Sequence, residues 1–176
     1  MSGIDPEVEA RQVERLATGG FRIRDPRRGV IEVEPAAEGW AVRLPDPDSA
    51  WTLRRSGPPQ GGFVLLAEDG ETEAGRTMTL GGLGFRPNLY YLLLGDGSLF
   101  RIVLRGPREG GFELLGWETP GAYLIARPDA AGWTLIPTPA SYGLPDLRAL
   151  SVLFAAEILE SEMPLEGCVD PVPAGP

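Results

Sequence analysis

Hydrophobic and polar residues alternate with a period of two along most of this chain, from residue 21 to residue 136. Phe21 and Ile23, for example, alternate with Arg22 and Arg24. This alternation predicts strands that bury one face and expose the other to water. Eleven candidate strands are found, with one more expected to be hidden by a weaker pattern, and they lie at 21–24, 31–34, 40–44, 51–54, 62–67, 77–80, 89–94, 99–104, 112–117, 122–126 and 133–136.

Glycine and proline separate these segments. Asp69-Gly70 and Asp96-Gly97 are dipeptides typical of tight hairpin turns, and further glycine pairs stand at 61–62 and 110–111. The strands recur every 8 to 12 residues or so, with no helical segment between them, which favours an antiparallel meander. Such a meander forms a barrel or a sandwich.

The one continuous apolar stretch of helical length is 147–159. Arg148 and Ser151 share one narrow stripe of the helix and Glu157 lies on the opposite side, so no broad polar face remains. A helix that is apolar on nearly every side must be buried. We therefore predict a buried helix over 146–160.

The size of a helix selects between the two β architectures. Twelve strands about 4.8 Å apart and tilted by about 40° close into a ring of roughly 12 Å backbone radius, whereas eight strands give about 8 Å. A helix with its side chains is about 10 to 12 Å across, so only the larger ring admits it. The predicted fold is mainly β: a closed antiparallel β-barrel of about 12 strands, over residues 21–163, around a central hydrophobic C-terminal α-helix.

Both ends of the chain are expected to lie outside this barrel. Residues 5–18 carry a thin apolar stripe and end at a glycine pair, which predicts a short surface helix within an extension over 1–20. Residues 164–176 form an acidic tail rich in proline and glycine that contains the only cysteine, Cys168. A single cysteine excludes an intrachain disulfide, and acidic neighbours disfavour a reactive thiol.

Composition removes several classes of chemistry. The net charge of −9 argues against a nucleic-acid partner, which requires a basic surface. All 16 basic residues are arginine and the chain has no histidine, which excludes histidine-assisted nucleophiles, Schiff-base lysines and imidazole-bound metals. We expect no catalytic residue, metal or cofactor, and hence no enzyme. The N-terminus does not resemble a signal peptide, so a cytoplasmic location is expected.

The antiparallel strands with glycine-bounded hairpins, followed by the short apolar helix at 147–159, resemble the tubby C-terminal-like fold. Tubby, phospholipid scramblase and plant LURP-one-related proteins share this fold. The resemblance covers roughly residues 21–160 and lies in the pattern and order of elements. It implies a 12-stranded barrel around a central hydrophobic helix and, for some members, interaction with anionic phospholipid head groups. Lysine and arginine form the head-group pocket of tubby, whereas this chain offers arginine alone.

The densest basic cluster is formed by Arg22, Arg24, Arg27 and Arg28. The first two project from the same outward face of a predicted strand, and the other two from the adjoining turn. Because guanidinium groups bind phosphate through paired hydrogen bonds, the cluster is a candidate site for an anionic lipid head group or a phosphorylated ligand. The alternative is a solvated face paired with Glu32 and Glu34 on the next strand, since opposite charges often pair across strands.

Acidic residues gather on two predicted turns, as Glu68, Asp69, Glu71 and Glu73 on one and Asp46 and Asp48 on the other. Clustered carboxylates suit Ca²⁺ or the acid and base of a glycosidase. Neither spacing matches a calcium loop, so both groups are interpreted as solvated turns. The segment 81–84, Gly-Gly-Leu-Gly, lacks the dinucleotide-binding pattern and is interpreted as a connection.

Two strands, at 90–94 and 123–125, are apolar on both faces. The outer faces are expected to be covered by the N-terminal helix or by a partner, which leaves a homodimer open. Two functional classes follow. The first is a non-enzymatic binding module of tubby-like type, whose surface arginines bind an anionic phospholipid membrane surface or a phosphorylated small ligand. The second is a structural or protein-interaction domain that pairs through its exposed apolar strands and binds no small molecule.

Overall fold

The computed structural model of the protein describes residues 10–46, 49–56, 61–79, 90–104, 110–118, 121–144, 147–163 and 165. Some of the features named above lie outside these residues. They are the first part of the N-terminal helix, Asp48, the glycine-rich segment 81–84, and the tail except for Leu165.

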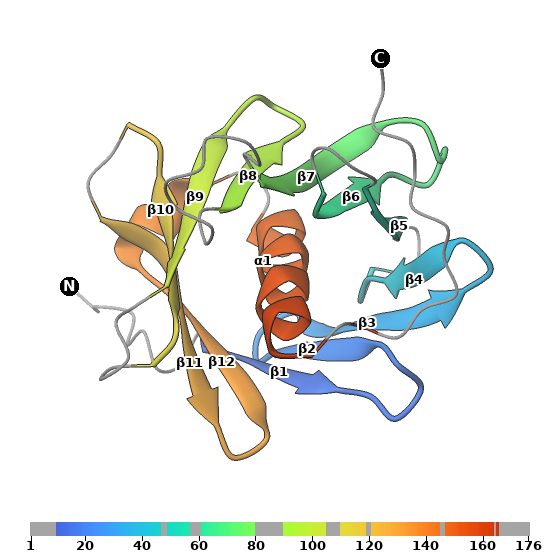
Figure 1. The fold of residues 1–176 in the computed structure, drawn as a ribbon, viewed down its shortest axis with the longest axis horizontal. Coiled ribbons are helices and arrows are strands. Elements are labelled where there is room, and N and C mark those ends of the chain that lie inside the picture. Colours follow the sequence, from blue (N-terminus) through green and yellow to red (C-terminus); the bar gives the residue numbers. More distant parts are fainter. Residues whose placement is uncertain are drawn as a thin grey trace.

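A closed barrel of twelve antiparallel strands surrounds one α-helix (Figure 1). Each strand pairs with the next in sequence, and the ring closes where β1 pairs with β12. The strands are β1 (Arg11–Arg15), β2 (Phe21–Asp25), β3 (Gly29–Ala36), β4 (Gly39–Arg43), β5 (Ala50–Arg55), β6 (Phe63–Leu66), β7 (Glu73–Thr79), β8 (Tyr90–Leu94), β9 (Leu99–Leu104), β10 (Phe112–Gly116), β11 (Ala122–Asp129) and β12 (Gly132–Pro137). A 3-10 helix, η2 (Pro139–Gly143), leads from β12 into α1 (Leu147–Glu162). The predicted barrel with a central C-terminal helix is confirmed.

Alternation along the strands fills the space between the barrel wall and the helix. In β2, Phe21 and Ile23 are fully buried, whereas Arg22 between them is partly exposed. The largest buried side chain is that of Trp40, which lies edge-on to Phe63 with ring centroids 5.9 Å apart. All eleven strands predicted from alternation are present, as β2 to β12.

The N-terminal helix predicted over 5–18 is wrong for its described part, because residues 11–15 form β1. Arg11 and Val13 are buried and Gln12 is exposed, which is the alternation of a strand. The composition of this segment suits a helix, but a helix here would leave β2 and β12 as open edges. As a strand the segment pairs with both. It is the twelfth strand, so the barrel begins at residue 11 and not at residue 21.

The polar residues of α1 are all accommodated inside the barrel, where every residue from Ala149 to Leu159 is buried. The Ser151 hydroxyl donates to the carbonyl oxygen of Leu147 at 2.7 Å. The Arg148 guanidinium lies over the Trp51 ring, 5.7 Å from its centroid. Glu157 accepts a hydrogen bond from the wall, described below. Among the described residues, no helix has the length and apolarity needed to cross a bilayer.

The barrel has two different ends, because the connections alternate between them around the ring. At the entry end lie the β2–β3, β4–β5, β6–β7, β8–β9 and β10–β11 connections, together with η2, from which α1 enters the barrel. At the exit end, the C-terminus of α1 emerges beside the last residues of β1 and β5. We use these two names below.

The helix packs most closely against β6, β7 and β8. Gly75 of β7 permits this close approach. A Cβ atom at position 75 would lie 2.8 Å from Cδ1 of Leu153 and 3.0 Å from the carbonyl oxygen of Leu93. Both distances are too short for an undisturbed fit, so the absence of a side chain at position 75 sets the position of the helix in the barrel.

We expect Gly75→Ala to lower the free energy of unfolding by about 1 to 3 kcal/mol, because the new methyl group overlaps Leu153. Leu153→Ala alone should cost about 2 to 5 kcal/mol, since it leaves a cavity in the core. The double variant should lose less than the sum, by about 0.5 to 3 kcal/mol, because each change relieves the other. Urea unfolding of the four proteins measures this coupling, and strict additivity would contradict the proposed contact.

Candidate functional site

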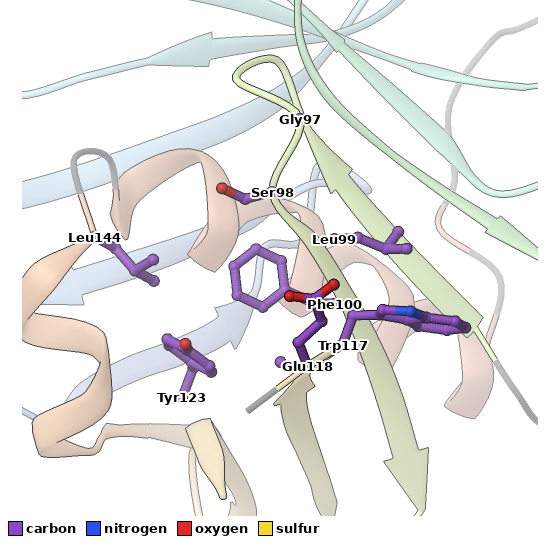
Figure 2. A pocket seen from close by; sticks show the side chains of 9 residues that line it. Gly97, Ser98, Leu99, Phe100, Trp117, Glu118, Tyr123 and Leu144 are labelled. Atoms are coloured by element: carbon purple, nitrogen blue, oxygen red, sulfur yellow. The ribbon is translucent and has the colours of Figure 1, made fainter. Parts of the chain in front are cut away.

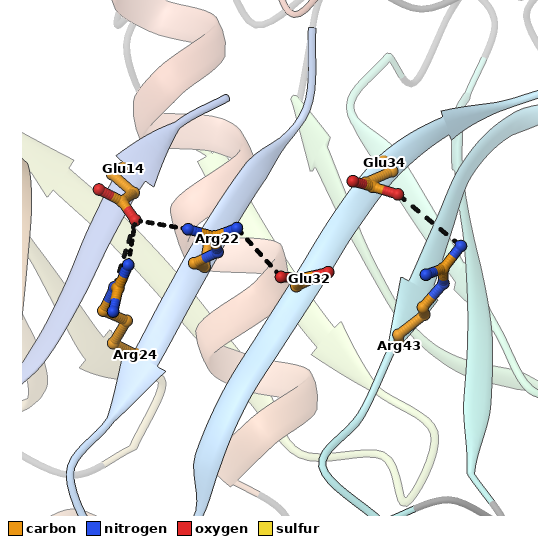
Figure 3. Close-up of polar contacts among 6 residues, drawn as sticks. All are labelled: Glu14, Arg22, Arg24, Glu32, Glu34 and Arg43. Atoms are coloured by element: carbon orange, nitrogen blue, oxygen red, sulfur yellow. Dashed lines mark hydrogen bonds and ion pairs between the residues drawn. The ribbon is translucent and has the colours of Figure 1, made fainter. Parts of the chain in front are cut away.

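The strand arginines of the predicted anion site are bound to carboxylates (Figure 3). Arg22 lies between Glu14 and Glu32, with Nη1 3.2 Å from Oε1 of Glu14 and Nη2 3.1 Å from Oε1 of Glu32. Arg24 reaches the same Glu14 oxygen at 3.1 Å. Hydrogen bonding from Arg24, with a further contribution from Arg22, lowers the pKa of the Glu14 carboxyl. The alternative of cross-strand pairing is therefore confirmed for Glu32.

Two partners in this network were not expected from the sequence. Glu14 lies on β1, the strand that alternation did not reveal, and it pairs with arginines of β2. Glu34 does not join the cluster and instead lies 3.8 Å from Arg43 of β4.

The other two arginines of the cluster lie on the β2–β3 turn at the entry end. The backbone N–H groups of Arg27 and Arg28 donate to Oδ1 of Asp25 at 2.9 and 3.2 Å, which fixes the turn. The second Asp25 oxygen lies 3.2 Å from Nη2 of the buried Arg11. The structure therefore assigns Arg22 and Arg24 to the barrel wall, and an anion site at the four arginines stays a prediction.

The acidic turn at the β6–β7 connection uses its own carboxylates. Oδ1 of Asp69 accepts the backbone N–H groups of Glu71 and Thr72 at 2.9 and 2.7 Å, and Oδ2 accepts the Thr72 hydroxyl at 2.5 Å. These bonds, led by that of the hydroxyl, lower the pKa of Asp69. Glu73 pairs with Arg76. The pattern agrees with the interpretation as a turn, and within the described residues no three acidic or thiol side chains gather as a metal site.

A buried polar cluster lies toward the exit end, around Glu157 of α1. The Thr77 hydroxyl donates to Oε1 of Glu157 at 2.5 Å and accepts the backbone N–H of Phe63 at 2.8 Å. Burial raises the pKa of the Glu157 carboxyl to about 7, and the nearby charge of Glu160 adds to this. The hydrogen bond from Thr77 and the charge of Arg55 act in the opposite direction.

Two arginines at the ends of strands hold the C-terminus of the helix at the exit end. Arg15 donates to the carbonyl oxygen of Leu159 and, at 2.7 Å, to that of Met163. Arg55 pairs with Glu160 and donates to the carbonyl oxygen of Leu165 at 2.6 Å. Guanidinium groups satisfy carbonyls that a helix C-terminus leaves without partners and complement its partial negative charge. These contacts make the exit end a structural anchor.

A pocket of about 380 Å³ opens at the entry end, between the β8–β9 hairpin, the end of β10 and the start of β11 (Figure 2). Its volume falls within the range of about 300 to 1,000 Å³ typical of small-molecule sites. Figure 2 shows Leu144 and Tyr123 on one side of it and Trp117 on the other. The lining residues are Gly97, Ser98, Leu99, Phe100, Gly116, Trp117, Glu118, Tyr123 and Leu144. We call this the rim pocket.

A β-bulge directs Tyr123 into the rim pocket. Leu114 lies opposite Leu124, but Leu115 lies opposite Ala122, so β11 carries one extra residue at this point. Strict alternation would turn Tyr123 outward, next to the buried Leu124. Instead its ring meets the inward ring of Phe100 edge-on, with centroids 5.2 Å apart and planes at 84°. Bulges commonly reorient a side chain in this way.

The other walls of the rim pocket are fixed by hydrogen bonds of the hairpins. The backbone N–H of Ser98 donates to Oδ1 of Asp96 at 2.8 Å, and that of Trp117 donates to the carbonyl oxygen of Leu99 at 3.1 Å. The Trp117 ring packs on the outward Tyr91 with centroids 5.4 Å apart. The indole is thus held in position although 53% of the residue is exposed.

The chemistry of the rim pocket suits binding. Of its nine described lining residues, Glu118 carries the only formal charge, and Ser98 bonds to Asp96, whose pKa this bonding lowers. Sequence reasoning did not find this site, because Trp117 and Tyr123 were interpreted as strand residues. The only available signal was an aromatic residue followed by an acid where a predicted strand ends.

We expect the stability of the protein to depend on pH through Glu157. Its pKa is near 7 when folded against an ordinary value of 4.5, so between these values the folded state holds a proton that the unfolded state has released. The free energy of unfolding therefore falls as pH rises from about 4.5 to about 7. Glu157→Gln removes this loss, so at pH 8 it should be more stable than the native protein by up to about 3 kcal/mol.

Urea unfolding at pH 5, 6, 7 and 8 measures this difference. Glu162→Gln is the control, because Glu162 lies on the same helix but is exposed. Its stability should run parallel to that of the native protein. The same parallel course for Glu157→Gln would show that Glu157 does not titrate in this range.

No family model, no curated protein and no solved structure matches this chain. Kinship with the tubby-like proteins therefore stays a prediction, while the twelve-stranded barrel with its central helix is observed directly.

Proposed function

We propose that this protein is a non-enzymatic binding module that holds a small ligand in the rim pocket. The observation that carries the proposal is the pocket itself, whose aromatic walls are positioned by a bulge and by hairpin hydrogen bonds before any ligand arrives. Preorganised walls favour binding, because little side-chain entropy is lost when a ligand enters. The interior of the barrel is occupied by α1, which leaves the rim as the place for a ligand.

This proposal keeps the class of function expected from the sequence and moves its site. An anionic head group at β2 would have to displace Glu14 and Glu32 from Arg22, or leave Arg24 bound to Glu14. Displacing an ion-paired carboxylate offsets much of the gain from a new phosphate contact. The rim pocket requires no such exchange.

The lining also favours binding over catalysis. It offers one carboxylate, and the chain has neither lysine nor histidine to act as a second proton-transfer group. General acid–base catalysis normally needs titratable groups within hydrogen-bond reach of the reacting atoms. A single exposed Glu118 beside aromatic rings is suited to recognition.

One observation supports the alternative of a protein-interaction domain. Apolar residues on the outward face of neighbouring strands remain partly exposed, and they are Leu93, Leu99, Val103, Leu115, Ile125 and Ile136. No described helix covers them, since residues 11–15 form a strand and not the predicted covering helix. The occupant that this alternative implies is a second copy of the chain.

We expect the rim pocket to be the site where small molecules perturb the protein. In a fragment screen followed by amide chemical shifts, the affected residues should be Gly97, Ser98, Trp117 and Tyr123. Trp117→Ala should weaken these ligands by about tenfold, since an aromatic contact contributes roughly 0.5 to 1.5 kcal/mol beyond its buried area. Met163→Ala is the control, because Met163 is similarly exposed but lies at the opposite end. Shifts centred elsewhere would contradict the proposed site.

Light scattering at several protein concentrations separates the two functions. If the rim pocket is the functional site, we expect the mass of one chain, 18.9 kDa, at every concentration. A dimer that Leu115→Arg dissociates would favour the interaction domain, because Leu115 lies in the outward apolar row.

A further inference from the structure

We infer that the ligand of the rim pocket is a small, weakly hydrated organic cation of the alkylammonium type. This inference rests on the proposed function and narrows it to one chemical class. Three features of the pocket carry it: its charge, its aromatic walls and its scarcity of free hydrogen-bonding groups.

The charge around the rim pocket is negative. Glu118 is the only charged residue among its nine described lining residues, and Asp96 stands next to the lining in the β8–β9 hairpin. Hydrogen bonds from Ser98 lower the pKa of Asp96, so this carboxylate keeps its charge well below neutral pH. The nearby placement of two carboxylates raises the local concentration of cations.

The basic residues of the entry end lie away from the pocket. Arg27 and Arg28 belong to the β2–β3 turn, which is separated from β10 by β11, β12 and β1 in the ring. The guanidinium group of Arg11 is paired with Asp25. A cationic ligand at Glu118 therefore does not face these positive charges across the hairpins.

The aromatic walls select a cation over other ligands of the same size. The rings of Phe100 and Tyr123 stand at 84° to each other, and Trp117 lies across the pocket from Tyr123 (Figure 2). The faces of aromatic rings attract cations, most strongly that of tryptophan. Walls on more than one side surround a compact cation and compensate for its lost hydration.

The hydrogen-bonding groups of the pocket favour an alkylated ammonium over a primary amine or a guanidinium. Ser98 is already bonded to Asp96, and Glu118 is the only carboxylate in the described lining. A primary ammonium has three donors and a guanidinium has five, and most would remain unsatisfied among aromatic walls. An alkylated ammonium has few donors or none, so it needs only charge and apolar contact.

The test compares choline with 3,3-dimethyl-1-butanol, which has the same shape without the charge. Titration of the intact protein, followed by calorimetry and amide chemical shifts, measures both. We expect choline to bind about tenfold or more tightly than the neutral alcohol, with shifts at Ser98, Trp117 and Tyr123.

Three variants separate local charge from overall charge. Glu118→Gln should weaken choline about fivefold to tenfold and leave the alcohol unchanged. Trp117→Leu should weaken choline by a similar factor. Glu71→Gln removes the same charge from a different hairpin of the entry end, and it should change neither ligand appreciably.

The outcomes distinguish this inference from the proposed function. Equal affinity for choline and the alcohol, both mapping to the rim pocket, overturns the cation inference and supports the pocket. Choline binding that Glu118→Gln and Trp117→Leu leave unchanged also overturns the inference, because the cation then binds elsewhere. If choline does not bind but fragments of other chemistry map to the pocket, the inference fails alone. If nothing maps there, both fail.

Discussion

The burial of α1 on every side is the constraint from which the rest of the structure follows. A helix whose residues from Ala149 to Leu159 all avoid water needs apolar contact around its whole circumference. A sheet that stays open covers one side only, whereas a closed ring of twelve strands covers all of them. The requirement reaches individual positions, such as Gly75, where the absence of a side chain lets the helix approach the wall. It also forces Ser151 and Glu157 to find hydrogen bonds inside.

A filled interior divides the work of the protein between the two ends of the barrel. At the exit end, Arg15 and Arg55 are occupied with the helix carbonyls, Glu160 and the chain that follows. At the entry end, the hairpins are fixed by their own Asp residues, which leaves the side chains beyond them available. The rim pocket lies at this second end, where a change in lining does not disturb the packing around α1.

The sequence predicted the elements of this fold more completely than their contacts. Eleven strands were visible because their inward residues are apolar, and the helix was visible because it lacks a polar face. β1 was not recognised, because one of its two inward residues is Arg11, whose charge is balanced by Asp25 from another strand. The network of Glu14 with Arg22 was missed for the same reason. The rim pocket depends on a bulge at Tyr123, and a register shift of one residue leaves no trace in hydrophobicity.

The pairing of β1 with β12 places Val13 opposite Trp133, so the ring is sealed by two segments from opposite ends of the sequence. Contacts between such distant segments are slow to form, since a long loop must close first. During synthesis, moreover, the core that fills the ring is made last, after all twelve strands. A nascent chain that has completed its strands still lacks the helix that makes their association favourable. The twelve strands and the helix thus form one cooperative unit, and shorter stretches of this chain have no stable structure to adopt.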